Sequence, residues 1–237
     1  MTDPLAASQP HTHGGRRATL GEVGLVFGPT VGVSFAGSLW AAHHGGRAAV
    51  AFTDAHLAGV LAYEALLAAL LLPWLTRRGW SPRRVAGGAP APRDVAIGGA
   101  LWLATVACYT LSWGVFAALQ PDAARALAGE HRFAGGASAL AVVAASVLNP
   151  VFEEFLWLGY GVPSLAPRLG LRGACALSVA LRVSVHLYQG AWAVLGILPV
   201  GLCLTWYYAR TRRLWPVVVA HVILDAVGLA QYLAARG

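Results

Sequence analysis

The chain has 237 residues, of which 57% are hydrophobic and only 11% are charged, and its mean hydropathy is +0.61. An average soluble domain carries roughly 25% charged residues, so the composition excludes that class and indicates an integral membrane protein. The net charge of +7 comes from 17 arginines and no lysine, and these arginines lie between apolar runs rather than along one face. We therefore expect the lipid bilayer as a partner and no nucleic acid.

Seven apolar segments are long enough to cross a bilayer, which requires roughly 20 residues. They follow a polar segment, residues 1–19, which has no pattern of a cleavable signal peptide and is predicted to be a disordered cytoplasmic tail. The predicted spans are residues 21–42, 55–75, 95–119, 138–160, 173–190, 191–209 and 215–234. The predicted fold class is therefore all-α, a polytopic transmembrane helix bundle of about seven spans.

The distribution of arginine predicts the orientation of this bundle. With the N-terminus inside, twelve arginines fall in inner segments and four in outer segments. The positive-inside rule then places the N-terminus in the cytoplasm and the C-terminus outside. We expect the plasma membrane as the location. Because one glycine, Gly190, separates spans five and six, this part can include a bent or re-entrant piece.

Two adjacent carboxylates, Glu153 and Glu154, interrupt the fourth span. An ionised side chain at membrane depth costs about 2.5–3.5 kcal/mol even on mild scales, so each requires a partner or a function. Pro150 predicts a kink just before them, and consecutive helix positions point about 100° apart. The two acids are thus expected to have different tasks. The alternative is a helix end that dips into the inner headgroup region.

Two later segments supply possible partners for these acids. Arg182 and His186 are four residues apart and share a helix face, as do His221 and Asp225. A buried Glu with two His can activate a water molecule by general-base catalysis. The same residue types can also hold zinc or another divalent metal, and the ligands would then be Glu154, His186 and His221. A purely structural hydrogen bond between His221 and Asp225 is the simpler alternative for that pair.

These motifs resemble the CPBP family of intramembrane proteases, which includes the type II CAAX prenyl endopeptidases and bacteriocin-processing or immunity homologues. The family pattern is E-E-x-x-x-R, then F-x-x-x-H, then H-x-x-x-N or H-x-x-x-D, on successive helices. Here Glu153-Glu154, His186, and His221 with Asp225 match in the same order. The resemblance covers roughly residues 138–234.

The resemblance implies an intramembrane endopeptidase that cleaves a peptide or protein substrate, lipidated in the best-known cases. It implies that Glu153, Glu154 and His186 activate the water and that His221 and Asp225 stabilise the oxyanion, with metal dependence left open. Residues 137–237 would form this protease-like core with its polar site between the C-terminal four helices, preceded by N-terminal transmembrane helices at 20–136.

Two positions depart from the family pattern. Leu158 replaces the arginine of the first motif, and Arg182 replaces the phenylalanine of the second. We predict that Arg182 compensates for the missing arginine and lies within salt-bridge distance of Glu153 or Glu154. Glu64, a lone acid in the second span, is expected to pair with Arg182 or a loop arginine.

Two other functions use the same residue types. A catalytically impaired protein of the same fold could act as an immunity or assembly factor. A proton-coupled transporter could use buried Glu, His and Asp as a relay, but the two similar halves typical of repeat-type transporters are not visible.

Overall fold

The computed structural model describes residues 18–44, 53–129, 136–189 and 191–234, and every regular element in these ranges is a helix. Most of the predicted tail, residues 1–17, and Gly190 lie outside the described residues. The elements are α1 (Leu20–Phe27), η2 (Gly28–Gly32), α2 (Val33–His43), α3 (Asp54–Arg77), α4 (Pro82–Val85), α5 (Pro92–Leu119), α6 (Pro121–Gly129), α7 (Ala139–Glu154), η4 (Phe155–Gly161), α8 (Val162–Ser184), η5 (Leu187–Gln189), α9 (Ala191–Thr211) and α10 (Trp215–Ala234).

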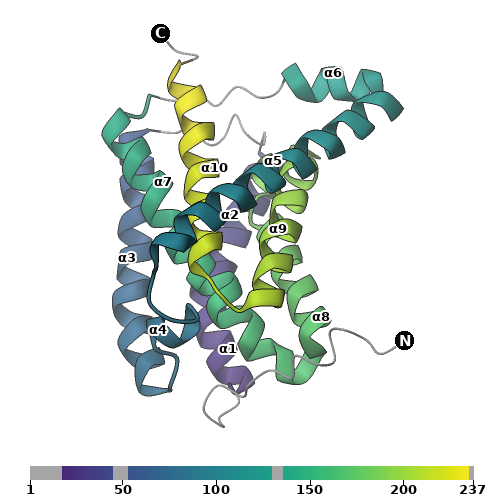
Figure 1. Cartoon of the computed structure of the whole chain (residues 1–237). Helices are drawn as coiled ribbons and strands as arrows, with labels where there is room; N and C mark the ends of the chain where they lie inside the picture. Colours follow the sequence, from purple (N-terminus) through teal and green to yellow (C-terminus); the bar gives the residue numbers. More distant parts are fainter. Residues whose placement is uncertain (1–17, 45–52, 130–135, 190, 235–237) are drawn as a thin grey trace, which may run out of the picture.

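Four helical segments of the described residues are long and apolar enough to cross a membrane: Leu20–His43, Asp54–Arg77, Pro92–Leu119 and Ala139–Ser184. The last of these has 46 residues and covers two predicted spans, and α9 and α10 follow it. The predicted all-α membrane bundle is therefore confirmed, and its helices accommodate about seven spans. In Figure 1, α1 begins and α10 ends at opposite ends of the bundle, as an odd number of spans requires.

The first helix begins where its sequence can cap it. Thr19 accepts a hydrogen bond from the Glu22 amide through its hydroxyl oxygen, at 3.1 Å. The Glu22 carboxylate accepts in return from the Thr19 amide at 2.6 Å. This capping box satisfies two of the amides that a helix start leaves unpaired, so the helix begins at Leu20.

The fourth span differs from its predicted boundaries. The helix does not end near residue 160 but continues through π-helical turns in η4 into α8, until Gly170 adopts a positive φ of 68°. This conformation carries no steric cost for glycine and breaks the helix. The second half of α8 then packs against η4 and α9 (Figure 1). The fifth span is accordingly short and ends at Ser184, not at residue 190.

Helix packing places the C-terminal four helices around one centre. Helix α10 packs against α5 and α7, and α8 packs against α9 and η4. The largest buried apolar cluster includes Leu158 and Tyr160 of η4 together with Leu214 and Val217 at the start of α10. Many outward apolar side chains, such as Leu70, are exposed. Such an exposed apolar surface is what a lipid solvent favours.

A polar clasp fixes the end of α10 that lies beside α4 and α5. Arg213, just before α10, donates to both carboxylate oxygens of Asp94 at the start of α5, and also to the carbonyls of Gly87 and Ala89. Asp94 is buried, and Gly87 has a φ of +72° with the Arg212 carbonyl so close that any Cβ would clash. These contacts therefore fix the start of α10 against α5, and with it the position of the polar residues on that helix along the bundle.

Candidate active site

Glu154 lies at the centre of the candidate site. It is the last residue of α7 and is 0% exposed. Arg182 of α8 contacts both of its carboxylate oxygens, with Nη1–Oε1 and Nη2–Oε2 distances of 2.8 Å each. Such a two-point contact is the strongest geometry that arginine offers a carboxylate. The predicted ion pair of Arg182 with one of the two acids is therefore present, and its partner is Glu154.

A second contact on α8 explains why Arg182 reaches this acid. The Ser178 hydroxyl, one helical turn earlier on the same face, donates to the Trp157 carbonyl at 3.1 Å. Trp157 belongs to η4, and π-helical turns depart from the i to i−4 ladder of an α-helix. This hydrogen bond ties α8 to η4, and the next turn of α8 brings Arg182 beside Glu154.

His221 of α10 is the other partner of Glu154. Its Nδ1 lies 2.7 Å from Oε1 of the acid, so the ring donates there through Nδ1–H. Its Nε2 lies 3.6 Å from Oδ1 of Asp225, beyond hydrogen-bond distance but within ion-pair distance. Glu154 therefore joins α7, α8 and α10, and Asp225 lies beside the opposite edge of the His221 ring.

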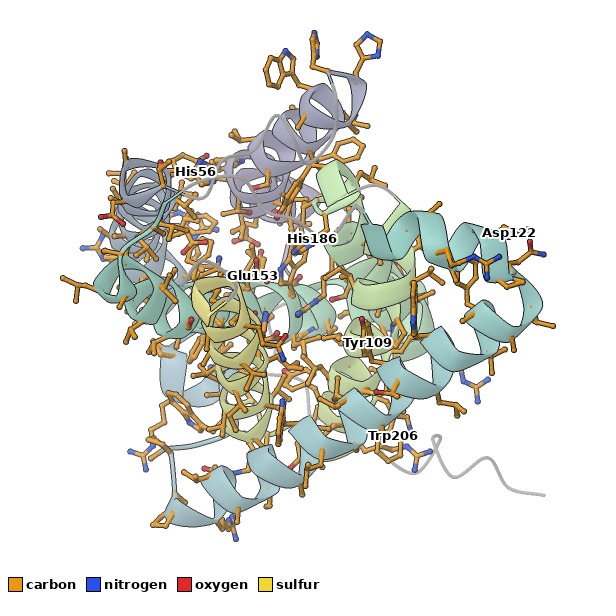
Figure 2. All side chains as sticks on the ribbon, turned by 90° about the horizontal axis from the view of Figure 1, so that it is seen from above. His56, Tyr109, Asp122, Glu153, His186 and Trp206 are labelled. Carbon is orange, nitrogen blue, oxygen red and sulfur yellow. The ribbon has the colours of Figure 1, made fainter. Side chains whose placement is uncertain are left out.

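His186 follows the end of α8, in a turn. Its Nδ1 lies 2.7 Å from the Arg182 carbonyl oxygen, which can only accept, so Nδ1 carries the proton. The Nε2 edge of the ring is then the acceptor in the neutral form. Glu153 and His221 both lie within electrostatic range of this ring. Figure 2 shows the labelled His186 and Glu153 toward the middle of the bundle, one after the end of α8 and the other on α7.

Glu153 has a different environment from Glu154, as the 100° rotation predicts. It is partly exposed, and among the described residues it accepts one long hydrogen bond, 3.5 Å from Asn149 Nδ2 to its Oε1. The same nitrogen lies 2.6 Å from Oε1 of Glu64 on α3. The expectation that Glu64 pairs with Arg182 or a loop arginine was wrong in its partner: Glu64 accepts from Asn149, and both terminal guanidinium nitrogens of Arg182 contact Glu154.

A cavity of about 410 Å³ lies beside these acids, between η2, α2, α3 and α7. Glu64 and Phe152, the residue before Glu153, form part of its wall. Most of the other lining residues are apolar or carry a single hydroxyl, for example Val33, Val60 and Thr30. The cavity is thus mostly apolar, with the carboxylate of Glu64 on its wall.

Asn149 and Glu64 were not among the predicted site residues. A signal for Asn149 was present, because it lies four residues before Glu153 and hence on the same face of α7. No sequence signal related Glu64 to this face, since the two residues are 85 positions apart and meet only through helix packing.

The proposed metal ligands do not fit a metal as they are arranged. Both oxygens of Glu154 are engaged by Arg182 and His221, and the Arg182 guanidinium would repel a second cation at that carboxylate. Nδ1 of His221 also faces the acid rather than an open coordination position. Within the described residues, no group of three or more His, Cys, Asp and Glu has the arrangement of a metal site.

The fold and the site together define a class: a polytopic helical membrane protein whose ionisable side chains converge inside the bundle. Residues 135–227 match the family model described as "Type II CAAX prenyl endopeptidase Rce1-like". The predicted resemblance to the CPBP intramembrane proteases is thereby confirmed for this region, which is Rce1-like and contains Glu153, Glu154, Arg182, His186, His221 and Asp225. Helices α1 to α6 lie outside the matched region. No curated protein and no solved structure matches the chain.

Proposed function

We propose that this protein is an intramembrane endopeptidase that hydrolyses a peptide bond with a water molecule activated by Glu153 and His186. The observation that carries the proposal is the difference in burial and pairing between the two adjacent acids. Glu154 is fully buried and has both oxygens engaged. Glu153 is partly exposed, lies within electrostatic range of His186, and forms no ion pair within the described part of the chain.

In the proposed reaction, Glu153 is the general base. It accepts a proton from a water molecule that the acceptor edge of His186 holds, and the resulting hydroxide attacks the peptide carbonyl carbon. The protonated Glu153 then gives its proton to the nitrogen of the leaving amine as the C–N bond breaks. The products are a carboxylic acid and an amine. The second water proton then leaves the acid for the amine, so that a carboxylate and an ammonium group are released and Glu153 is again ionised.

His221 and Asp225 act on the other side of the carbonyl in this mechanism. Because Nδ1 of His221 faces Glu154, the Nε2 edge is the one that can donate to the developing oxyanion. Asp225 lies beside that edge and favours a proton on it. Glu154 and Arg182 are positioning residues, since they hold the His221 ring and the α7–α8 contact without meeting the substrate.

A peptide substrate at the bilayer, lipidated as in CAAX proteins, fits this site. The mostly apolar cavity between α2 and α3 supports an approach from the lipid side. The inner location of the arginines supports an N-terminus in the cytoplasm and insertion in the plasma membrane.

Cleavage of a farnesylated C-a-a-X reporter peptide by the purified protein in liposomes tests the proposal. Glu153→Gln and His186→Ala should each abolish cleavage, whereas Asp122→Asn on the exposed surface of α6 should not change it. Treatment with 1,10-phenanthroline should leave the rate unchanged, because Arg182 and His221 occupy the Glu154 oxygens. Equal cleavage by wild type and Glu153→Gln would overturn the mechanism. No cleavage of this peptide or of unlipidated membrane peptides by the wild type would favour an immunity or assembly role.

A further inference from the structure

Glu64 is an acid in the middle of an apolar helix. Between Asp54 at the start of α3 and Arg77 at its end, it is the one residue with a formal charge. A carboxylate at this depth is costly, and such residues face the interior and mark functional sites more often than not. The acid is present here although α3 lies outside the region that matches the family model.

One side-chain amide joins Glu64 to the proposed general base. Asn149 Nδ2 lies 2.6 Å from Oε1 of Glu64 and 3.5 Å from Oε1 of Glu153. An amide nitrogen has two hydrogens, so one can serve each carboxylate. The second oxygen of Glu64, Oε2, is buried without a hydrogen-bond partner among the described residues. Among the described residues, Asn149 is thus the one hydrogen-bond partner of the Glu64 carboxylate.

Helix packing alone does not require Glu64. The outer ends of α3 and α7 are already joined by Asp54, which accepts from the Ser138 amide at 2.5 Å, and by apolar contacts around Leu57 and Val142. The effect of Glu64 is more local. With its amide held by α3, Asn149 presents its second hydrogen to Glu153 one helical turn later.

We propose that Glu64 is a positioning residue of the site: it holds the amide of Asn149, which in turn orients the Glu153 carboxylate. Glu64 does not meet the substrate in this role. The inference deepens the proposed function and rests on it for its kinetic test, but the hydrogen-bond arrangement can be measured without any substrate.

Asn149 is the only asparagine in the chain, so labelling with [¹⁵N]asparagine gives a single side-chain amide pair in the NMR spectrum. Glu64→Leu and Glu64→Asp should move one of the two amide proton resonances upfield, because the acceptor is removed or falls one methylene short. Glu64→Gln keeps an acceptor and should give a much smaller shift. Glu153→Gln should affect the other proton of the pair.

Tyr63→Phe is the matched control. It removes the 2.7 Å hydrogen bond from the adjacent α3 residue to the Pro29 carbonyl, and should leave the Asn149 pair unchanged. If Glu64→Leu does not fold, Glu64→Asp and Glu64→Gln give the same comparison. The proposal is overturned if Glu64→Asp and Glu64→Gln both leave the two resonances where they are in the wild type.

The kinetic test separates positioning from a merely structural role. Displacement of a catalytic group by about 1 Å can cost up to a hundredfold in rate, so Glu64→Leu and Glu64→Asp should lower kcat about tenfold or more with KM little changed. Glu64→Gln should retain most of the activity. In an Asn149→Ala background, Glu64→Leu should have no further effect, since both act through one path.

An equal loss of kcat from Glu64→Leu in the wild-type and Asn149→Ala backgrounds would show that Glu64 does not act through Asn149, and would overturn the proposal. An effect confined to KM would do the same. If the wild type cleaves no peptide, the proposed function fails and the NMR result alone decides the role of Glu64.

Discussion

Arg182 of α8 and Glu154 of α7 form a two-point ion pair, with each terminal guanidinium nitrogen 2.8 Å from a different carboxylate oxygen. Neither side chain is more than 3% exposed. The family pattern has an arginine four residues after this acid, where the present chain has the fully buried Leu158. The cation thus comes from the neighbouring helix while the charge balance at Glu154 is kept.

The first prediction concerns this exchange of positions. Arg182→Leu should abolish activity and lower stability by about 3–5 kcal/mol, because it leaves a buried carboxylate without its cation. The double change Leu158→Arg with Arg182→Phe, which restores the family pattern, should recover much of both losses. Activity and the midpoint of denaturant unfolding in micelles measure the two effects. Wild-type activity and an unchanged unfolding midpoint in Arg182→Leu would show that the ion pair contributes to neither.

The second prediction separates Glu153 from Glu154. Glu153→Gln should abolish cleavage with the unfolding midpoint nearly unchanged, since the hydrogen bond that Glu153 accepts from Asn149 is long, at 3.5 Å. Glu154→Gln should lower activity and stability together, because Arg182 and His221 then lose the charge that they share. Unfolding midpoints and single-turnover rates of both variants give the comparison. The assignment is wrong if Glu154→Gln retains wild-type stability and loses only its rate.

The third prediction concerns Asp225. Asp225→Asn should lower kcat moderately, about tenfold, because the charge that favours a proton on Nε2 of His221 is lost while a polar group stays beside the ring. Asp225→Leu should lower it further, since no polar group remains there. KM should stay within about twofold in both variants, because Asp225 acts through the histidine. A stronger effect of Asn than of Leu would contradict this role.

The fourth prediction concerns the clasp at the start of α10. Arg213→Lys should destabilise the protein by about 1–3 kcal/mol, because lysine cannot reproduce the two contacts with Asp94 and the bonds to the Gly87 and Ala89 carbonyls. Asp94→Asn should have a similar effect. Asp122→Asn, in the exposed pair with Arg125, is the control and should leave the unfolding midpoint unchanged.

The fifth prediction is the orientation in the membrane. A reporter fused after residue 85, in α4, should be active on the cytoplasmic side, and a reporter at the C-terminus should be active outside. An odd number of spans requires opposite sides. If both reporters read the same side, one segment counted as a span does not cross the bilayer.

Much of the candidate site could be predicted from the residues alone. Ionisable side chains are so costly in apolar helices that Glu153, Glu154, Arg182, His186 and His221 are identified by their surroundings. The number of spans follows from the length of apolar runs, because bilayer thickness sets that length. The ion pair with Arg182 follows from charge balance, since two adjacent acids require a nearby cation.

Only the tertiary structure decided which acid is buried in an ion pair and which is partly exposed. The sequence places Glu153 and Glu154 about 100° apart, but which direction faces Arg182 depends on the π-helical turns of η4 and the break at Gly170. The same break shortens the fifth span, so that His186 lies in the turn after its end rather than inside it. Glu64 joins them through Asn149 across 85 positions, because side-chain packing between α3 and α7 is a long-range property that local spacing does not encode.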